Sequence, residues 1–237
     1  MAKLVLVRHG ESTWNALNLF NGWVDTPLSD RGRLEIQDTA LSLKDAQIHF
    51  DYAYTSMLTR AIESTNLLLQ GINAEYIPVT KSWRLNERHY GSLQGMNKLE
   101  AVNQWGEKQV KAWRRSYDVQ PPLDSEYQQV IEVEGQEYPL FDQRYADVKF
   151  GDLPLGESLM MTVDRVLPLW FNEISDRLSK NQNILIVAHG NSIRAFRKYL
   201  EKLDDSSISE LEIKNGEAVV YDFDNMLSIV DKRIIRN

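Results

Sequence analysis

The sequence of 237 residues contains no cysteine. This absence excludes a disulfide framework, a thiolate zinc site and a cysteine nucleophile, and it is consistent with a reducing compartment. Proline and glycine are also scarce, with 7 and 12 residues, too few for a long disordered linker. An excess of basic residues is lacking as well, because 27 lysines and arginines face 34 acidic residues. The resulting net charge of −7 disfavours a nucleic-acid partner, so any anionic ligand must be met by a local cluster of cations.

Long hydrophobic runs are missing too. The apolar run Leu4 to Val7 near the N-terminus is too short for a signal peptide. No other run approaches the roughly 18 apolar residues that a membrane span requires. We therefore expect a cytoplasmic protein without a membrane partner. Because the sequence shows neither a repeat nor a linker, we interpret residues 1–237 as a single domain.

Short apolar segments alternate along the chain with amphipathic ones, which is typical of an α/β protein. The patterns predict strands at 3–7, 51–54, 76–79 and 183–188, helices at 30–44, 56–71, 97–105, 107–117, 158–178 and 190–200, and an antiparallel strand pair at 218–223 and 227–235. This order predicts a three-layer α/β/α sandwich with a mainly parallel central sheet. Residues 118–156 carry four prolines and no helical period, so we expect an inserted lid segment there.

Two of the four histidines share one local pattern, His-Gly-x-Ser, at His9 and His189. With 4 histidines and 12 glycines, chance predicts only about 0.2 His-Gly pairs. Each of the two follows an apolar strand and precedes a helix, so both side chains should reach the carboxyl edge of the sheet, where α/β folds bind ligands. A structural, hydrogen-bonded role is the alternative for either histidine alone. The pair favours a ligand site. Neutral imidazole is a competent nucleophile, and without cysteine the usual nucleophiles are His, Ser, Asp, Glu, Lys or Tyr.

Two arginines fit this interpretation. Arg8 precedes His9, and Arg60 lies in the first turn of the helix that follows the second strand. Guanidinium groups match phosphate oxygens in bidentate fashion, so a histidine flanked by them suits phosphoryl transfer. The alternative for Arg60 is an ordinary solvated side chain at a helix start. The sequence has no His-x-x-x-His or comparable spacing, and we therefore predict no metal.

Five motifs in this order resemble the histidine phosphatase superfamily and, within it, the cofactor-dependent phosphoglycerate mutases. They are LVLVRHGES at 4–12, YTSMLTRAI at 54–62, SWRLNERHYGSLQG at 82–95 followed by Asn97-Lys98, WRR at 113–115 and AHGNS at 188–192. The resemblance extends over essentially the whole chain.

The resemblance implies a role for each matching residue. His9 would be the phosphorylated nucleophile, Arg8, Arg60 and His189 would hold the transferring phosphoryl group, and Glu87 would be the acid/base. Without the resemblance, Glu87 would be interpreted as a surface salt-bridge residue. Substrate contacts are implied for Arg8, Ser12, Asn15, Asn21, Gly22, Arg60, Glu87, Arg88, His89, Tyr90, Lys98, Arg114, Arg115, Gly190 and Asn191.

The implied activity is an isomerase that interconverts 2-phosphoglycerate and 3-phosphoglycerate in glycolysis and gluconeogenesis, through a phosphohistidine primed by 2,3-bisphosphoglycerate. The partner would be the small-molecule phosphoglycerate substrate, and the assembly a homodimer or homotetramer. One alternative is a bisphosphoglycerate synthase or phosphatase, or a broader histidine phosphatase, on the same scaffold. Another is a catalytically silent phospho-ligand-binding module, which the complete set of catalytic residues disfavours.

The number of cations bears on these alternatives. Arg88, Lys98, Arg114 and Arg115 exceed what one phosphoryl group needs, and they would suit a second charged group on the substrate. The alternative for the last two is a solvated helix face. The chain ends at Asn237, where many family members continue into a mobile tail. We therefore expect residues 118–156 to contribute more to shielding the site from water.

Overall fold

The computed structural model describes residues 1–124, 130–133, 135–139 and 143–235. A central sheet has six strands in the order β3-β2-β6-β1-β7-β8. The strands are β1 (Ala2–Arg8), β2 (Tyr52–Thr55), β3 (Val79–Lys81), β6 (Ile184–Ala188), β7 (Ala218–Phe223) and β8 (Ile229–Ile235). Strands β3, β2, β6 and β1 run parallel, whereas β7 is antiparallel to both β1 and β8. The predicted mainly parallel sheet with a closing antiparallel pair is confirmed.

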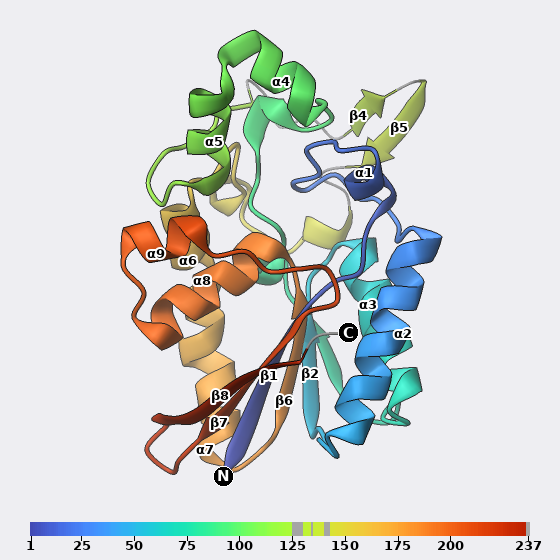
Figure 1. Cartoon of the computed structure of the whole chain (residues 1–237), viewed down its shortest axis with the longest axis vertical. Coiled ribbons are helices and arrows are strands. Elements are labelled where there is room, and N and C mark those ends of the chain that lie inside the picture. The colour runs from blue at the N-terminus through green and yellow to red at the C-terminus, as the bar shows by residue number, and fades with distance from the viewer. Residues whose placement is uncertain (125–129, 134, 140–142, 236–237) are drawn as a thin grey trace.

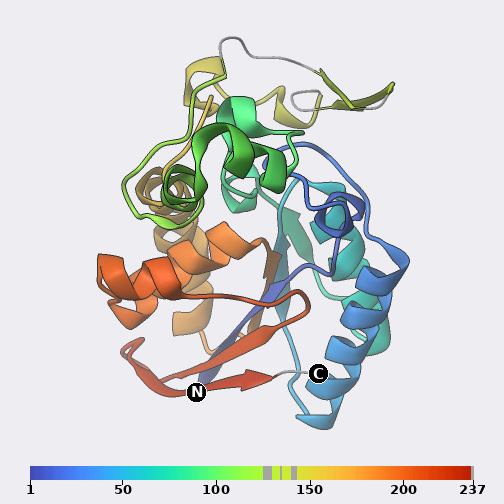
Figure 2. The same ribbon diagram turned by 45° about the horizontal axis from the view of Figure 1, so that its top comes forward.

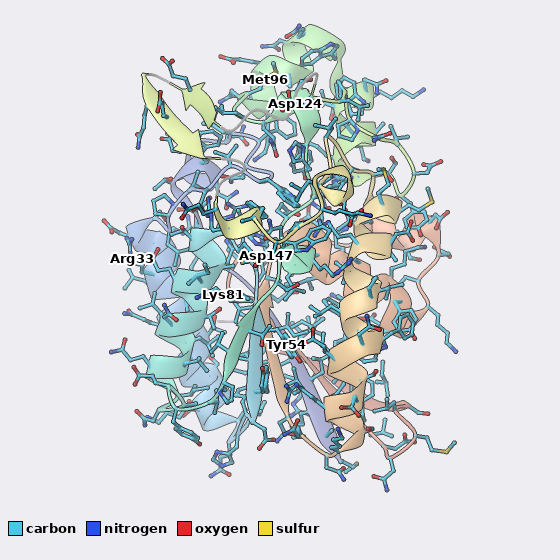
Figure 3. The ribbon with its side chains drawn as sticks, turned by 180° about the vertical axis from the view of Figure 1, so that it is seen from behind. Arg33, Tyr54, Lys81, Met96, Asp124 and Asp147 are labelled. Atoms are coloured by element: carbon cyan, nitrogen blue, oxygen red, sulfur yellow. The ribbon has the colours of Figure 1, made fainter. Side chains whose placement is uncertain are left out.

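Helices cover both faces of this sheet, and the three predicted layers are visible in Figure 1. One layer contains α2 (Asp30–Asp45) and α3 (Thr59–Gly71). The other contains α6 (Leu159–Leu169), the π-helical turn η5 (Trp170–Ile174), α7 (Ser175–Ser179) and α8 (Gly190–Glu201). The same layers are seen from behind in Figure 3, where Tyr54 marks strand β2.

The alternation of side chains along β1 explains why two layers form. Leu4 and Leu6 belong to the core shared with α6, α7 and α8, whereas Val5 and Val7 belong to the core shared with α2 and α3. Successive residues of a strand point to opposite faces, so a strand that is apolar throughout must be covered on both sides. The run of apolar residues at the start of the chain therefore dictates a central position for β1.

The register of β1 on β6 decides where the two histidines lie. Arg8 pairs with Ala188 at the carboxyl ends of these parallel strands. His9 follows β1 and His189 follows β6, so the two histidines leave the sheet side by side. The backbone N–H of His9 donates to the carbonyl of Ala188 at 3.0 Å, which extends the pairing by one residue.

A second group of short elements lies beyond this edge of the sheet. It comprises α1 (Thr13–Ala16), η1 (Trp83–Leu85), η2 (Gly91–Leu93), α4 (Lys98–Trp105), α5 (Glu107–Arg115), β4 (Val130–Val133), β5 (Gln136–Pro139), η3 (Gln143–Tyr145), η4 (Phe150–Asp152) and α9 (Asp205–Glu210). A small core that includes Phe20, Leu93 and Trp113 packs α4 and α5 against η2 and against the loop after α1 that carries Phe20. Figure 2 shows α4 and α5 above the sheet and the β4–β5 hairpin extending beyond them.

Two expectations need comment. The strand predicted at 76–79 begins three residues later, at Val79, where pairing with β2 starts. Before it, the backbone N–H of Ile77 donates to the carbonyl of Ala74 and forms a turn. The predicted lid at 118–156 includes residues 125–129, 134 and 140–142, which lie outside the described residues. Its described part contains the β4–β5 hairpin and two 3-10 turns, and its action as a lid stays a prediction. Within the described residues, no helix is long and apolar enough to span a membrane.

Candidate active site

A cavity of about 280 Å³ opens at the carboxyl ends of β1 and β6. Many predicted site residues line it, namely Arg8, His9, Asn15, Asn21, Gly22, Arg60, Glu87, Tyr90, Lys98, Arg114, Arg115, Gly190 and Asn191. The other lining residues are Leu19, Phe20, Arg194, Leu211, Glu212, Ile213 and Lys214. Seven lining residues are lysines or arginines and two are glutamates, although the whole chain carries a net charge of −7. The cavity is therefore built for an anionic ligand.

The imidazole of His9 is held in one tautomer. Its Nδ1 lies 2.6 Å from the carbonyl oxygen of Gly10, and because a carbonyl only accepts, Nδ1 must carry the proton. The lone pair is then on Nε2. Burial, together with the nearby Arg60 and Arg8, lowers the His9 pKa well below its ordinary value. The imidazole is thus neutral at pH 7, which is the form required of a nucleophile.

Two glycines allow the loop after His9 to lie directly on the first turn of α2. A Cβ on Gly10 would stand 2.1 Å from the carbonyl oxygen of Gly32, and a Cβ on Gly32 would stand 2.0 Å from that of Glu11. No side chain can be accommodated at such distances. Glycine at both positions therefore fixes the direction in which the chain leaves His9.

Arg8 and Arg60 supply buried positive charge next to His9. Arg60 donates to the carbonyls of Gly22 at 2.7 Å and Val24 at 2.8 Å, and Arg8 donates to the carbonyl of Ile213 at 2.6 Å. The Nε atom of each arginine has no hydrogen-bond partner among the described residues. Burial lowers the Arg60 pKa to about 10, which still leaves it charged at pH 7. Two fixed guanidinium groups with spare donors can bind the oxygens of a phosphoryl group.

His189 lies beside His9. Its ring centroid is 4.8 Å from that of His9 in an edge-on arrangement, and its Nε2 is 2.7 Å from Ser56 Oγ. Burial and the neighbouring Arg60 lower its pKa well below the ordinary value, so this imidazole is also neutral at pH 7. The structure thus brings the two predicted histidines together, although His189 does not line the cavity itself.

The Glu87 carboxylate faces the same space. Its Oε1 accepts from the backbone N–H groups of Arg88 at 2.8 Å and Asn191 at 3.1 Å. A Cβ placed on Gly190 would stand 3.7 Å from both Glu87 Oε2 and Arg8 Nε, so these two groups converge over the first residue of α8. A carboxylate in the cavity wall can exchange a proton with a bound ligand that comes within hydrogen-bond distance.

A second set of cations comes from α4 and α5. Lys98 is the first residue of α4, and Arg114 and Arg115 end α5. Arg115 forms an ion pair with Glu212 at 2.5 Å. Burial, aided by repulsion from Arg114, lowers the Lys98 pKa to about 8. These charges lie in the same cavity as His9 but come from elements packed beyond the sheet.

Three predicted contact residues lie outside the cavity lining. Ser12 caps α1, since its Oγ accepts from the Asn15 backbone N–H and from Asn21 Nδ2, each at 3.1 Å. His89 accepts from the backbone N–H of Gly91 at 3.0 Å, and burial lowers its pKa to about 3. Arg88 donates to the carbonyl of Arg114 at 2.6 Å and lies over the ring of Tyr90. Ser12 and Arg88 thus support lining residues, whereas Gly91, the partner of His89, does not line the cavity. Direct substrate contact by the three residues stays a prediction.

Two cations in the lining were missed at the sequence level. Arg194 lies one turn after Gly190 on α8, and it donates to Asn191 Oδ1 at 2.9 Å and to the carbonyl of Arg115 at 3.1 Å. Its position four residues after Gly190 would have placed it on the same face of the helix as the His-Gly motif, and this was the signal available in the sequence. Lys214 belongs to the loop before β7, and no local pattern marks that loop. It reaches the site because the backbone N–H of Gly216 donates to the carbonyl of Arg8 at 3.0 Å.

The described residues contain no group of three or more histidine, aspartate or glutamate side chains placed to hold a metal ion. The expectation of metal-independent chemistry stays a prediction, and the cations of the cavity are the charges available to an anionic substrate.

Comparisons with known proteins find relatives that are similar over nearly the whole chain. The 2,3-bisphosphoglycerate-dependent phosphoglycerate mutase 2 of Latilactobacillus sakei is 48% identical over 233 residues, 98% of this chain and 99% of that protein. The 2,3-bisphosphoglycerate-dependent phosphoglycerate mutase of Staphylococcus haemolyticus is 49% identical over 231 residues, 98% of each chain.

Solved structures share the fold. A mycobacterial glucosyl-3-phosphoglycerate phosphatase in complex with VO3 superposes with a TM-score of 0.71 at 22% identity, covering 100% of this chain and 98% of the other. The alpha-ribazole phosphatase of Shigella flexneri gives 0.68 at 23% identity, covering 99% and 96%. A family model for the histidine phosphatase superfamily (branch 1) matches residues 4–132 and 123–232. The chain therefore belongs to the histidine phosphatase superfamily.

Proposed function

We propose that this protein is a 2,3-bisphosphoglycerate-dependent phosphoglycerate mutase that interconverts 2-phosphoglycerate and 3-phosphoglycerate. One observation carries the proposal: the cavity that contains His9 and Glu87 holds a second set of cations, Lys98, Arg114 and Arg115. Arg8, Arg60 and His189 are enough for one phosphoryl group. The second set matches the carboxylate of a phosphoglycerate and the further phosphate of a bisphosphoglycerate.

The chemistry of the first half-reaction follows from the groups around His9. In the phosphorylated enzyme, the free hydroxyl of phosphoglycerate attacks the phosphorus on His9, and the P–N bond breaks as the new P–O bond forms. Glu87 takes the hydroxyl proton. Arg8 and Arg60 stabilise the charge on the three equatorial oxygens, which is where a loose phosphoryl-transfer transition state holds it.

The second half-reaction restores the enzyme that is phosphorylated on His9. The neutral Nε2 of His9 attacks the phosphorus of the other phosphate, the P–O bond to the glycerate carbon's oxygen breaks, and Glu87 returns its proton to that oxygen. 2,3-Bisphosphoglycerate supplies the phosphoryl group that loads His9 before the first turnover. Because Glu87 acts once as a base and once as an acid, both directions of the isomerisation use the same residues.

The residues fit such a ligand in charge. The buried donors Arg8 Nε and Arg60 Nε have no protein partner among the described residues, and they lie on the His9 side of the cavity. Lys98 and Arg114 add charge from α4 and α5. A ligand with anionic groups at both ends would relieve the mutual repulsion of these cations.

The test is an assay of 3-phosphoglycerate conversion with and without added 2,3-bisphosphoglycerate, run beside an assay of inorganic phosphate release. We expect isomerisation to require priming and to exceed hydrolysis, and we expect labelled bisphosphoglycerate to leave an acid-labile phosphoryl group that is lost in His9→Ala. Phosphate release faster than isomerisation would favour the phosphatase alternative instead.

A further inference from the structure

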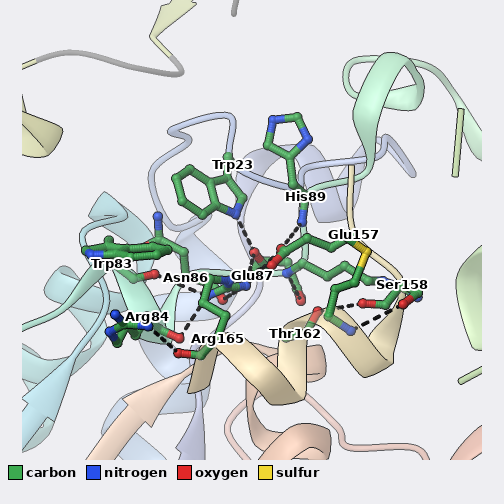
Figure 4. A network of polar contacts seen from close by, with 12 residues as sticks. Trp23, Trp83, Arg84, Asn86, Glu87, His89, Glu157, Ser158, Thr162 and Arg165 are labelled. Carbon is green, nitrogen blue, oxygen red and sulfur yellow. Dashed lines mark hydrogen bonds and ion pairs between the residues drawn. The ribbon is translucent and has the colours of Figure 1, made fainter. Parts of the chain in front are cut away.

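A buried ion pair lies under the segment that carries Glu87. Glu157 is 2% exposed and Arg165, on α6, is 7% exposed, and neither lines the cavity. Figure 4 shows both side chains next to the segment that carries Asn86, Glu87 and His89, with dashed lines to its backbone. Neither residue belongs to the set assigned above to catalysis or substrate binding.

The guanidinium group of Arg165 bonds both to Glu157 and to the backbone of this segment, and one N–H of its Nη2 is shared between two acceptors. It donates to Glu157 Oε1 at 2.6 Å and Oε2 at 2.9 Å, and to the carbonyls of Trp83 at 3.1 Å, Arg84 at 2.8 Å, Asn86 at 3.2 Å and Glu87 at 3.2 Å. Four carbonyls within five residues thus point at one planar cation. Only arginine presents donors in such a fork, and a lysine at this position would offer three donors from a single nitrogen.

Glu157 holds the other side of the same segment. Its Oε2 accepts from the backbone N–H of His89 at 2.8 Å, and its own backbone N–H donates to the carbonyl of His89 at 2.8 Å. The indole of Trp23 adds a third restraint by donating to the carbonyl of Glu87 at 2.6 Å. The backbone is therefore tied down immediately before and after the residue whose carboxylate enters the cavity.

Stability alone does not account for this arrangement. Removing two charges from water is expensive, and well-packed apolar residues often serve stability as well as a buried ion pair does. What apolar residues cannot do is bind four carbonyls and an amide in one defined geometry. The ion pair is suited to setting where the backbone of Glu87 lies.

We propose that Arg165 and Glu157 are positioning residues that orient the Glu87 carboxyl for proton transfer. The inference rests on the acid/base role of Glu87 in the proposed function. It adds that the acid/base role of Glu87 depends on the Arg165–Glu157 ion pair, which does not line the cavity. Proton transfer requires hydrogen-bond distance, and a displacement of about 1 Å can reduce a rate by about 100-fold.

The experiment compares two substrates that differ in their need for Glu87. Transfer to or from a phosphoglycerate hydroxyl needs a proton, whereas nitrophenolate leaves nitrophenyl phosphate without one. In Arg165→Lys we expect kcat for phosphoglycerate to fall about 10- to 100-fold. The burst of nitrophenolate that accompanies phosphorylation of His9 should stay within about threefold of wild type. In the background of Glu87→Gln, Arg165→Lys should cause little further loss, because both changes affect the same step.

Arg197→Lys is the matched control. Arg197 is 4% exposed, and its Nε bonds to Glu201 at 2.8 Å, so it is also a buried arginine paired with a glutamate, but its hydrogen bonds go to Glu201 and not to residues 83–89. We expect it to leave the ratio of the two activities unchanged. Glu157→Gln is the second variant, and thermal unfolding shows which variants are folded at the assay temperature.

A parallel fall of both activities in a folded variant would overturn the proposal, and so would an unchanged phosphoglycerate rate. If the wild type does not isomerise phosphoglycerate, the proposed function fails by itself. The positioning role is then decided by comparing hydrolysis of 3-phosphoglycerate, an alkyl phosphate, with the nitrophenolate burst in the same variants.

Discussion

The charge on Lys98 should make substrate capture depend on pH in the alkaline range. Its amine is removed from water in the cavity wall, and the positive charges of Arg114 and Arg8 add to that effect, while Tyr90 and Glu87 oppose it. The resulting pKa is about 8, against 10.5 for a free lysine side chain. A lysine is charged below its pKa and neutral above it, so raising the pH through 8 removes one of the cations that attract the substrate.

The size of the effect follows from that value. At pH 7 about nine tenths of Lys98 is charged, whereas at pH 9 about one tenth is charged. If only the charged form binds the substrate anion, kcat/KM should fall about 10-fold between pH 7 and pH 9, which corresponds to about 1.4 kcal/mol. The profile of kcat/KM is the relevant one, because it reports groups of the free enzyme.

The assay is the initial rate of 3-phosphoglycerate conversion between pH 6.5 and 9.5, with the coupling enzyme in excess. Lys98→Arg is the control, because arginine keeps its charge over this range. We expect the variant to lose the part of the alkaline fall that is due to Lys98 and to keep any part due to Tyr90. Burial raises the Tyr90 pKa, but the charge of Arg88 and its hydrogen bond help to make the net shift a lowering. A wild-type profile that is flat to pH 9.5, or a parallel fall in Lys98→Arg, would refute the reasoning.

Three further outcomes are expected. Glu87→Gln should lower kcat about 100-fold to 10,000-fold with a smaller effect on KM, as measured by steady-state kinetics. A near-normal rate would return Glu87 to a surface role. Changing Arg114 and Arg115 together to Gln should mainly raise KM, more for the bisphosphate than for the monophosphates, whereas unchanged constants would indicate a solvated helix face. Gly22→Ala should lower the free energy of unfolding in urea by about 1–3 kcal/mol, because Gly22 has φ of +52° and a Cβ there would stand 2.0 Å from Gln94 Oε1. An unchanged urea midpoint would contradict this.

Local patterns in the sequence determined the fold class and the place of His9 at the end of β1. The apolar run of β1 predicts a strand covered on both faces, and Ser29 predicts the start of α2, whose first turn it caps by accepting from the Gly32 N–H. These signals work because periodicity and capping depend on residues within a few positions of one another. Where the local signal was ambiguous, as at β3, the prediction missed by three residues.

Only the tertiary structure decided which distant residues meet at the site. Lys214 reaches the cavity through pairing of its loop with the end of β1, and Arg165 reaches the Glu87 segment from α6. Neither contact leaves a periodic or capping signal, because each depends on how elements far apart in the chain pack together. The same holds for the charge state of Lys98, since its low pKa results from burial and from cations on other elements. Sequence patterns thus indicate the candidate site residues, and packing sets their geometry, protonation and supporting contacts.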